Sequence, residues 1–166
     1  MTGAALRRVG QFWRHASARV TLQERANVEQ LLGPLAGFFL ELPVNDQRHG
    51  LDVLDTVIRS EVQPSRLLQQ AALLHDVGKG EAHFSVVERS LIVLLRATTP
   101  VTLKALLRSR PSFAGRYAIY ADHARIGAER LRAAGAGELA AIVAEHHAAD
   151  PASAVTRQLQ RADGRN

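Results

Sequence analysis

Apolar residues recur at helical spacing along most of this 166-residue chain, and this periodicity is what most constrains its fold. In residues 46–60, for example, Val53 and Val57 share one apolar stripe. Nowhere does a sustained alternation of apolar and polar residues, the pattern of a half-buried strand, lie between turn residues. The sequence therefore predicts an all-α fold, a single compact helical bundle.

Proline and glycine divide the pattern into separate elements. Leu31–Leu42 is an apolar element that Pro43 stops. We expect further helices over residues 46–60, 64–78, 84–97, 101–108, 120–134, 137–149 and 152–163. Gly78 is placed to end the second of these, and residues 109–115 are predicted to form a loop.

Length and composition suit one domain with a real core. The hydrophobic fraction is 46% and the charged fraction 22%, which is ordinary globular usage and argues against overall disorder. The absence of cysteine excludes disulfides, thiolate metal sites and cysteine nucleophiles. We expect residues 1–25 to be a basic, loosely ordered N-terminal segment and residues 26–166 to be the domain.

The net charge of +5 comes from 19 arginines and two lysines against 16 acidic residues. This arginine bias is typical of a GC-rich genome, and the basic residues are dispersed without an aromatic platform, so nucleic acid is an unlikely partner. The apolar runs are too short to span a bilayer. No signal peptide is visible, and we expect a cytoplasmic protein.

Polar residues at apolar positions are the informative feature. Asp76 follows the apolar stretch 71–74, near the negative end of a predicted helix dipole. A carboxylate is unfavourable there both because of the dipole and because of burial. A bound cation would resolve both problems, and His75 would offer it a second ligand.

The same anomaly recurs on other predicted helices. His49, His146 and Asp163 each lie on the apolar stripe of their helix, and His123 opens another. A single histidine on an apolar face is usually a hydrogen-bonded core residue. The coincidence of several histidines and carboxylates without cysteine instead suits Zn, Fe, Mn or Co.

The order of these residues resembles the HD-domain superfamily of metal-dependent phosphohydrolases. The order consists of His49, His75-Asp76, His123, His146-His147 and Asp163, and His75-Asp76-Val77-Gly78-Lys79 looks like the HD-x-G-K signature of that superfamily. The resemblance covers roughly residues 40–163. It implies a metal site in the core of the bundle.

The resemblance also implies roles for individual residues. His49, His75, Asp76 and Asp163 would hold one ion, and Asp76 would bridge to a second ion held by His123 and His146. His147 would be a second-sphere or alternative ligand. Asp76 and Lys79 would be catalytic, with Lys79 facing the substrate phosphate. Arg48 and Arg125 are further candidates for phosphate contact.

The sequence departs from the HD-GYP cyclic di-GMP phosphodiesterases, a dinuclear branch of the superfamily. No Gly-Tyr-Pro loop follows His147, and Asn45 stands where some members have an acidic ligand. The long interval from Asp76 to His123 contains an apolar insertion, residues 84–115, which would serve as a lid or a homodimer surface.

The resulting prediction is a metal-dependent phosphohydrolase. Its cofactor would be two divalent ions (Fe, Mn, Zn, Co or Ni), and a metal-activated water would attack a small phosphomonoester or phosphodiester, with a nucleotide as the expected substrate. Two alternatives remain open. One is an HD-fold di-iron oxygenase, and the other is a non-catalytic HD module that binds a nucleotide or a protein.

Overall fold

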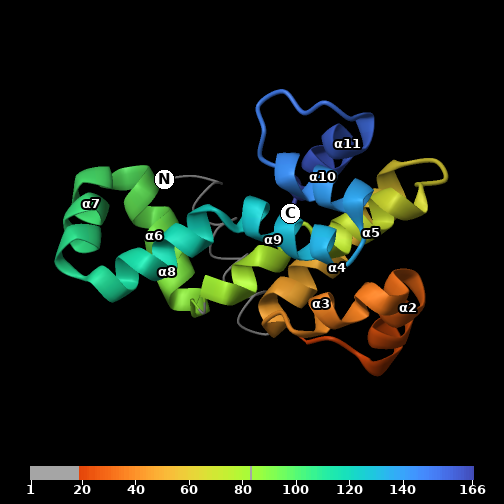
Figure 1. The fold of residues 1–166 in the computed structure, drawn as a ribbon, viewed down its shortest axis with the longest axis horizontal. Helices are drawn as coiled ribbons and strands as arrows, with labels where there is room; N and C mark the ends of the chain where they lie inside the picture. Colours follow the sequence, from red (N-terminus) through yellow and green to blue (C-terminus); the bar gives the residue numbers. More distant parts are fainter. Residues whose placement is uncertain (1–18, 83) are drawn as a thin grey trace, which may run out of the picture.

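A computed structural model of the chain describes residues 19–82 and 84–166, and every regular element in them is helical (Figure 1). This confirms the predicted all-α class. Most of the predicted basic N-terminal segment lies outside the described residues. Its last residues, 22–25, form the first turn of a helix that a capping box between Thr21 and Glu24 begins.

The elements follow one another with short connections. In chain order they are α2 (Leu22–Leu32), η1 (Gly33–Leu35), α3 (Ala36–Leu40), α4 (Val44–Ser60), α5 (Arg66–Leu74), η2 (Val77–Ala82), α6 (Val86–Thr98), α7 (Pro100–Ser109), α8 (Pro111–Ala121), α9 (His123–Ala133), α10 (Gly137–Glu145) and α11 (Ala154–Asp163), where η marks a 3-10 helix.

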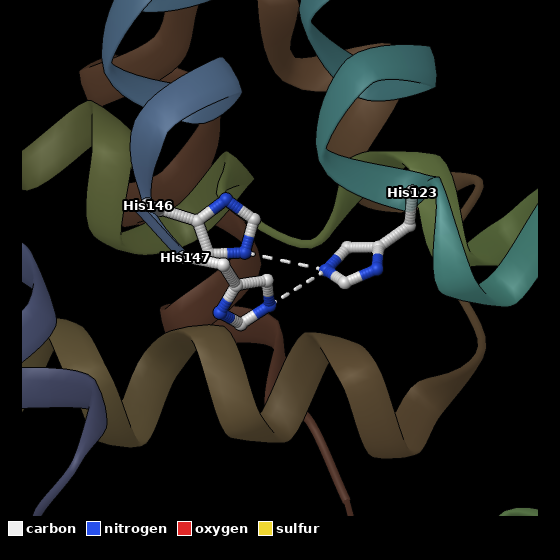
Figure 2. Close-up of side chains that lie close together, drawn as sticks. All are labelled: His123, His146 and His147. Atoms are coloured by element: carbon white, nitrogen blue, oxygen red, sulfur yellow. Dashed lines mark hydrogen bonds between the residues drawn. The ribbon is translucent and has the colours of Figure 1, made fainter. Parts of the chain in front are cut away.

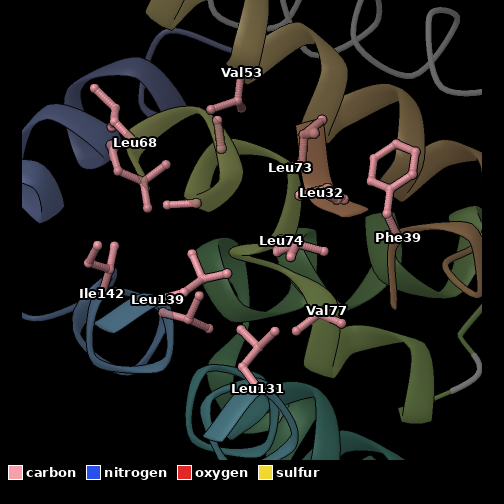
Figure 3. Close-up of a cluster of buried hydrophobic side chains, with 14 of the residues drawn as sticks. Leu32, Phe39, Val53, Leu68, Leu73, Leu74, Val77, Leu131, Leu139 and Ile142 are labelled. Carbon is pink, nitrogen blue, oxygen red and sulfur yellow. The ribbon is translucent and has the colours of Figure 1, made fainter. Parts of the chain in front are cut away.

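The bundle consists of α2–α5 and α9–α11 around one apolar core (Figure 3). Phe39, Leu74, Leu131 and Leu159 are among its fully buried side chains. Helix α5 lies at the centre, and residues 71–78 are buried without interruption. The last turn of α5, residues 71–74, is apolar on all sides, and such a turn can satisfy its surface only inside a core. Because the chain leaves α5 inside the core, the residues that follow α5 are buried as well.

Helices α6, α7 and α8 form an arm that extends away from the bundle (Figure 1). We define the arm as residues 84–121. It has a small core of its own, in which Phe84 and Ile92 are buried and Phe113 and Tyr117 pack against them. The connection to the bundle runs through η2 before the arm and through the junction of α8 and α9 after it.

Some predictions of element boundaries are wrong. Residues 109–115 are not a loop, because α8 begins at Pro111. Proline fits the first position of a helix, where its missing N–H has no intrahelical partner, so here it starts an element. The helix predicted to reach Gly78 ends at Leu74, and Gly78 lies inside η2.

None of the helices in the part of the chain that the structure describes is long and apolar enough to cross a bilayer.

Candidate metal centre

The structure brings the six predicted metal ligands together at the centre of the bundle. They come from five places: His49 in α4, His75 and Asp76 in the turn after α5, His123 at the start of α9, His146 just after α10, and Asp163 at the end of α11. Helices that are distant in the sequence thus meet at the buried end of α5.

Four of these residues form a first group. The Nε2 atom of His49 lies 3.0 Å from Asp163 Oδ1 and 3.8 Å from Asp76 Oδ2. The Nε2 atom of His75 lies 3.5 Å from the same oxygen of Asp76 and 3.7 Å from Asp163 Oδ1. Ligands of a tetrahedral ion with bonds of about 2.0–2.2 Å lie about 3.4 Å apart, so these spacings suit one ion.

A second group lies beside the first. The Nε2 atom of His123 is 3.2 Å from that of His146 and 3.2 Å from that of His147 (Figure 2). Asp76 Oδ1 lies 3.3 Å from His123 Nε2 and 3.8 Å from His146 Nε2. The two groups therefore share Asp76, and each of its oxygens faces a different group.

Backbone hydrogen bonds orient three of the imidazoles. The Nδ1 atoms of His75, His123 and His146 lie 3.0, 2.8 and 2.6 Å from the carbonyl oxygens of the residues three positions earlier. A carbonyl oxygen only accepts, so each Nδ1 carries a proton, and the neutral form of each ring would present an unprotonated Nε2 to its group. Two nitrogen lone pairs 3.2 Å apart, at His123 and His146, repel unless a proton or a cation lies between them.

Two buried atoms of the centre have no hydrogen-bond partner within the described residues. They are His75 Nε2 and Asp76 Oδ1, one facing the first group and one the second. Such atoms cost free energy unless something compensates them. The donor set and its unsatisfied atoms therefore fit divalent metal ions.

Electrostatics favour the ligand forms of these side chains. Burial lowers the pKa of His75, and it lowers that of His146 to about 3, despite the opposing charge of Asp76. Both rings are thus neutral near pH 7, as metal ligands must be. Burial alone would raise the pKa of Asp76, yet Lys79 and the neighbouring imidazoles hold this pKa well below its usual value.

Lys79 lies at the edge of the centre. Its Nζ donates a hydrogen bond of 2.5 Å to Asp76 Oδ2, and it is 5.9 Å from the centre of the Tyr120 ring. The ammonium group therefore lies next to the carboxylate that both groups share. Tyr120 was not among the predicted site residues, although its carbonyl oxygen also accepts the hydrogen bond from His123. Its place one turn before His123 was the only sequence signal.

Two glycines allow the elements of the centre to approach one another. A Cβ atom on Gly78 would lie 2.1 Å from the carbonyl oxygen of His123, and one on Gly127 would lie 2.9 Å from the side chain of Val77. Side chains at these positions would push η2 away from α9. The prediction that Gly78 ends a helix is therefore wrong. The missing side chain of Gly78 instead lets His123 come close to Asp76.

The two arginines predicted as candidates for phosphate contact lie apart from the two groups of metal ligands. Arg48 forms ion pairs with Glu24 at 2.6 Å and with Asp52 at 2.9 Å. Arg125 is exposed and forms ion pairs with Asp122 and Glu129. Acidic neighbours thus already occupy both guanidinium groups, whereas Lys79 is adjacent to the ligands.

His147 is placed closer to the centre than a second-sphere role requires. It is exposed, but its Nε2 can share a metal ion with those of His123 and His146. Helix α10 ends at Glu145 rather than at residue 149, so both histidines lie in the turn that follows it. In this turn two consecutive side chains can face the same point, which a continuous helix would not permit.

Fold and site together define a class: an all-α protein with two adjacent His/Asp groups that can hold divalent metal ions. The family described as "Cas3, HD domain" matches residues 35–165, a span that includes both groups and Lys79. The chain belongs to this family, and the expected membership of the HD-domain superfamily is confirmed. No curated protein and no solved structure shows a significant match.

Proposed function

We propose that the chain is a phosphohydrolase with a dinuclear metal centre. His49, His75 and Asp163 would hold one ion, His123, His146 and His147 the other, and Asp76 would bridge them. The observation that carries the proposal is the division of the two Asp76 oxygens between two groups of histidines. A capping or merely solvated aspartate would have no reason to be surrounded in this way.

The metal ions, when bound, would supply a water of lowered pKa and positive charge for the phosphoryl oxygens. The side chains of the chain have separate tasks. The backbone bonds at Nδ1 hold the imidazoles in the ligand orientation before any metal arrives. Lys79, whose ammonium group donates a hydrogen bond to the shared Asp76, would offset negative charge that develops on the phosphate.

The family favours a phosphodiester over a phosphomonoester as substrate, because HD domains of the Cas3 family are of nuclease type. The dispersed basic residues alone argue against nucleic acid, but family membership makes a nucleic acid a substrate to test beside a small nucleotide. A nucleic acid shares a phosphodiester bond with a cyclic nucleotide or a dinucleotide, and attack by water would cleave that bond into a phosphomonoester and an alcohol.

The experiment combines metal content with turnover. The protein is purified without chelator, its metal is quantified per chain, and hydrolysis is measured with bis(p-nitrophenyl) phosphate, p-nitrophenyl phosphate and a labelled single-stranded DNA oligonucleotide. We expect about two ions per chain, and faster hydrolysis of the diester than of the monoester. Lys79→Ala should slow turnover while retaining the ions.

Arg125→Ala serves as the matched control, since it removes an exposed cation already paired with acidic side chains. Its turnover should equal that of the unaltered chain. A protein that stays metal-free after incubation with excess Mn²⁺, Fe²⁺ and Zn²⁺ would contradict the proposal. So would a protein that binds metal but hydrolyses none of the three substrates.

A further inference from the structure

The net positive charge of the chain is concentrated in the arm. Residues 84–121 contain six basic residues and one acidic residue, a net charge of +5. Residues 1–83 contain nine of each, and residues 122–166 contain six of each. The imbalance arises because no aspartate or glutamate occurs between Glu88 and Asp122, so the arm has the whole surplus charge of the chain.

The cations of the arm are exposed. Arg96 lies on α6, Lys104 and Arg108 lie on α7, and Arg110 lies between α7 and α8, all with exposed side chains. Arg116 differs, because it pairs with Glu88 at 2.9 Å, the one acidic residue of the arm. The positive charges of Lys104, Arg108 and Arg110 therefore have no acidic residue of the arm left to balance them.

The same helices expose aliphatic side chains. Val87, Leu91 and Leu94, at spacings of four and three, form one stripe of α6 and are 65%, 45% and 50% exposed. On α7, Val101 is 78% exposed and shares a face with Lys104 and Arg108. Most apolar side chains of comparable size in the bundle are buried instead.

Exposed aliphatic groups on the same helices as unbalanced cations are the composition of helices that lie in the plane of an anionic membrane surface. We propose that the arm binds such a surface, with the aliphatic side chains of α6 and α7 at the boundary between headgroups and acyl chains and the cations at lipid phosphates. This function is additional to hydrolysis and does not depend on it.

Other occupants fit the arm less well. A second copy of the chain would bring one arm of charge +5 against another. A nucleic-acid strand would satisfy the cations, but it would leave Val101 and Leu94 in water. Proteins that bind single strands offer aromatic side chains for stacking, whereas Phe84 and Phe113 of the arm pack in its own core.

The test measures binding of the full chain to vesicles by co-sedimentation, once with phosphatidylcholine alone and once with phosphatidylglycerol added. We expect binding only to the anionic vesicles, weakened by salt. The double variants Lys104→Glu/Arg108→Glu and Leu91→Ser/Leu94→Ser should each reduce the partition coefficient by more than about tenfold. Should the second variant fold poorly by circular dichroism, the more exposed Val101→Ser replaces it.

Matched controls lie outside the arm. Arg132→Glu changes an exposed cation of α9, and Val62→Ser changes an aliphatic side chain that is 96% exposed after α4. Neither should alter vesicle binding. The proposal is overturned if anionic vesicles are not bound, or if the arm variants bind as tightly as the controls.

The same variants separate lipid from nucleic acid. Binding of single-stranded DNA that only the charge variant weakens, without binding to vesicles, would overturn the proposal in favour of a nucleic-acid surface. All binding measurements are repeated with Asp76→Ala. That variant removes the shared ligand of the metal groups. Vesicle binding that persists in it would therefore support membrane binding by the arm independently of hydrolysis.

Discussion

The bundle and the arm depart from the usual distribution of side chains in opposite directions. The bundle buries histidines and an aspartate at its centre, and it has no surplus of positive charge. The arm exposes valines and leucines and has a net charge of +5. Each departure costs stability unless a partner compensates it. Under the two proposals above, the partner of the bundle would be a small cation held inside, whereas the partner of the arm would be an extended surface.

The largest effect should follow from Asp76→Ala. Because both metal groups share this carboxylate, we expect loss of both ions. Substitution of a residue that only supports a metal ligand typically lowers activity about 10–100-fold, and we expect a larger fall in phosphodiester hydrolysis here. Metal analysis and turnover measure the two effects. Asp150→Ala, which removes an exposed carboxylate, should change neither. Full turnover in Asp76→Ala would contradict the proposal that the bundle holds a metal centre on which hydrolysis depends.

Core truncation tests whether the bundle holds most of the folding free energy. Leu131 is fully buried in α9, so Leu131→Ala should lower the free energy of unfolding by about 2–5 kcal/mol. Leu94→Ala in the arm, where the side chain is 50% exposed, should cost less than about 1 kcal/mol. Urea unfolding followed by circular dichroism gives both values. Equal losses would show that the arm is as tightly packed as the bundle.

The contact of η2 with α9 should be sensitive to one methyl group. Gly78→Ala places a Cβ atom 2.1 Å from the carbonyl oxygen of His123, so we expect a loss of about 1–3 kcal/mol and weaker metal binding. Gly80→Ala is the matched change in the same element, where a Cβ would lie 3.7 Å from Leu42. It should have little effect on the melting temperature or the metal content. A melting temperature of Gly78→Ala equal to that of Gly80→Ala would contradict the close approach.

The smallest effect on stability is expected in the arm. Lys104→Glu/Arg108→Glu changes exposed side chains, so the free energy of unfolding should stay within about 0.5 kcal/mol and hydrolysis of bis(p-nitrophenyl) phosphate should be unchanged. Thermal unfolding and steady-state kinetics measure both. A large fall in turnover would mean that the arm takes part in the chemistry, and the two regions would then not be independent.

Sequence reasoning was most effective where a single helix contained the signal. The spacing of His146 from Leu139 and Val143 predicted that its side chain points inward, and the structure buries it. Spacing was less effective at helix ends. Pro111 begins α8 where a loop was expected, because proline suits both a break and a first turn.

The basic residues show a different limit of the sequence analysis. They are dispersed along the chain, which argued against nucleic acid as a partner, but the acidic residues are absent from one stretch. This matters only because α6, α7 and α8 extend together from the bundle (Figure 1). The partners of Arg48 and Arg125 likewise became visible only with the helices in place.

The sequence by itself determined the helical class and the set of inward-facing polar side chains, because both depend on the spacing of residues within one helix. The family resemblance already implied a shared Asp76, and the tertiary structure shows how the side chains are arranged around it. It directs the two oxygens of Asp76 toward different groups, and it adds His147 to the second group. These features depend on the distance and angle between α4, α5, α9, α10 and α11, which packing fixes and no local pattern encodes.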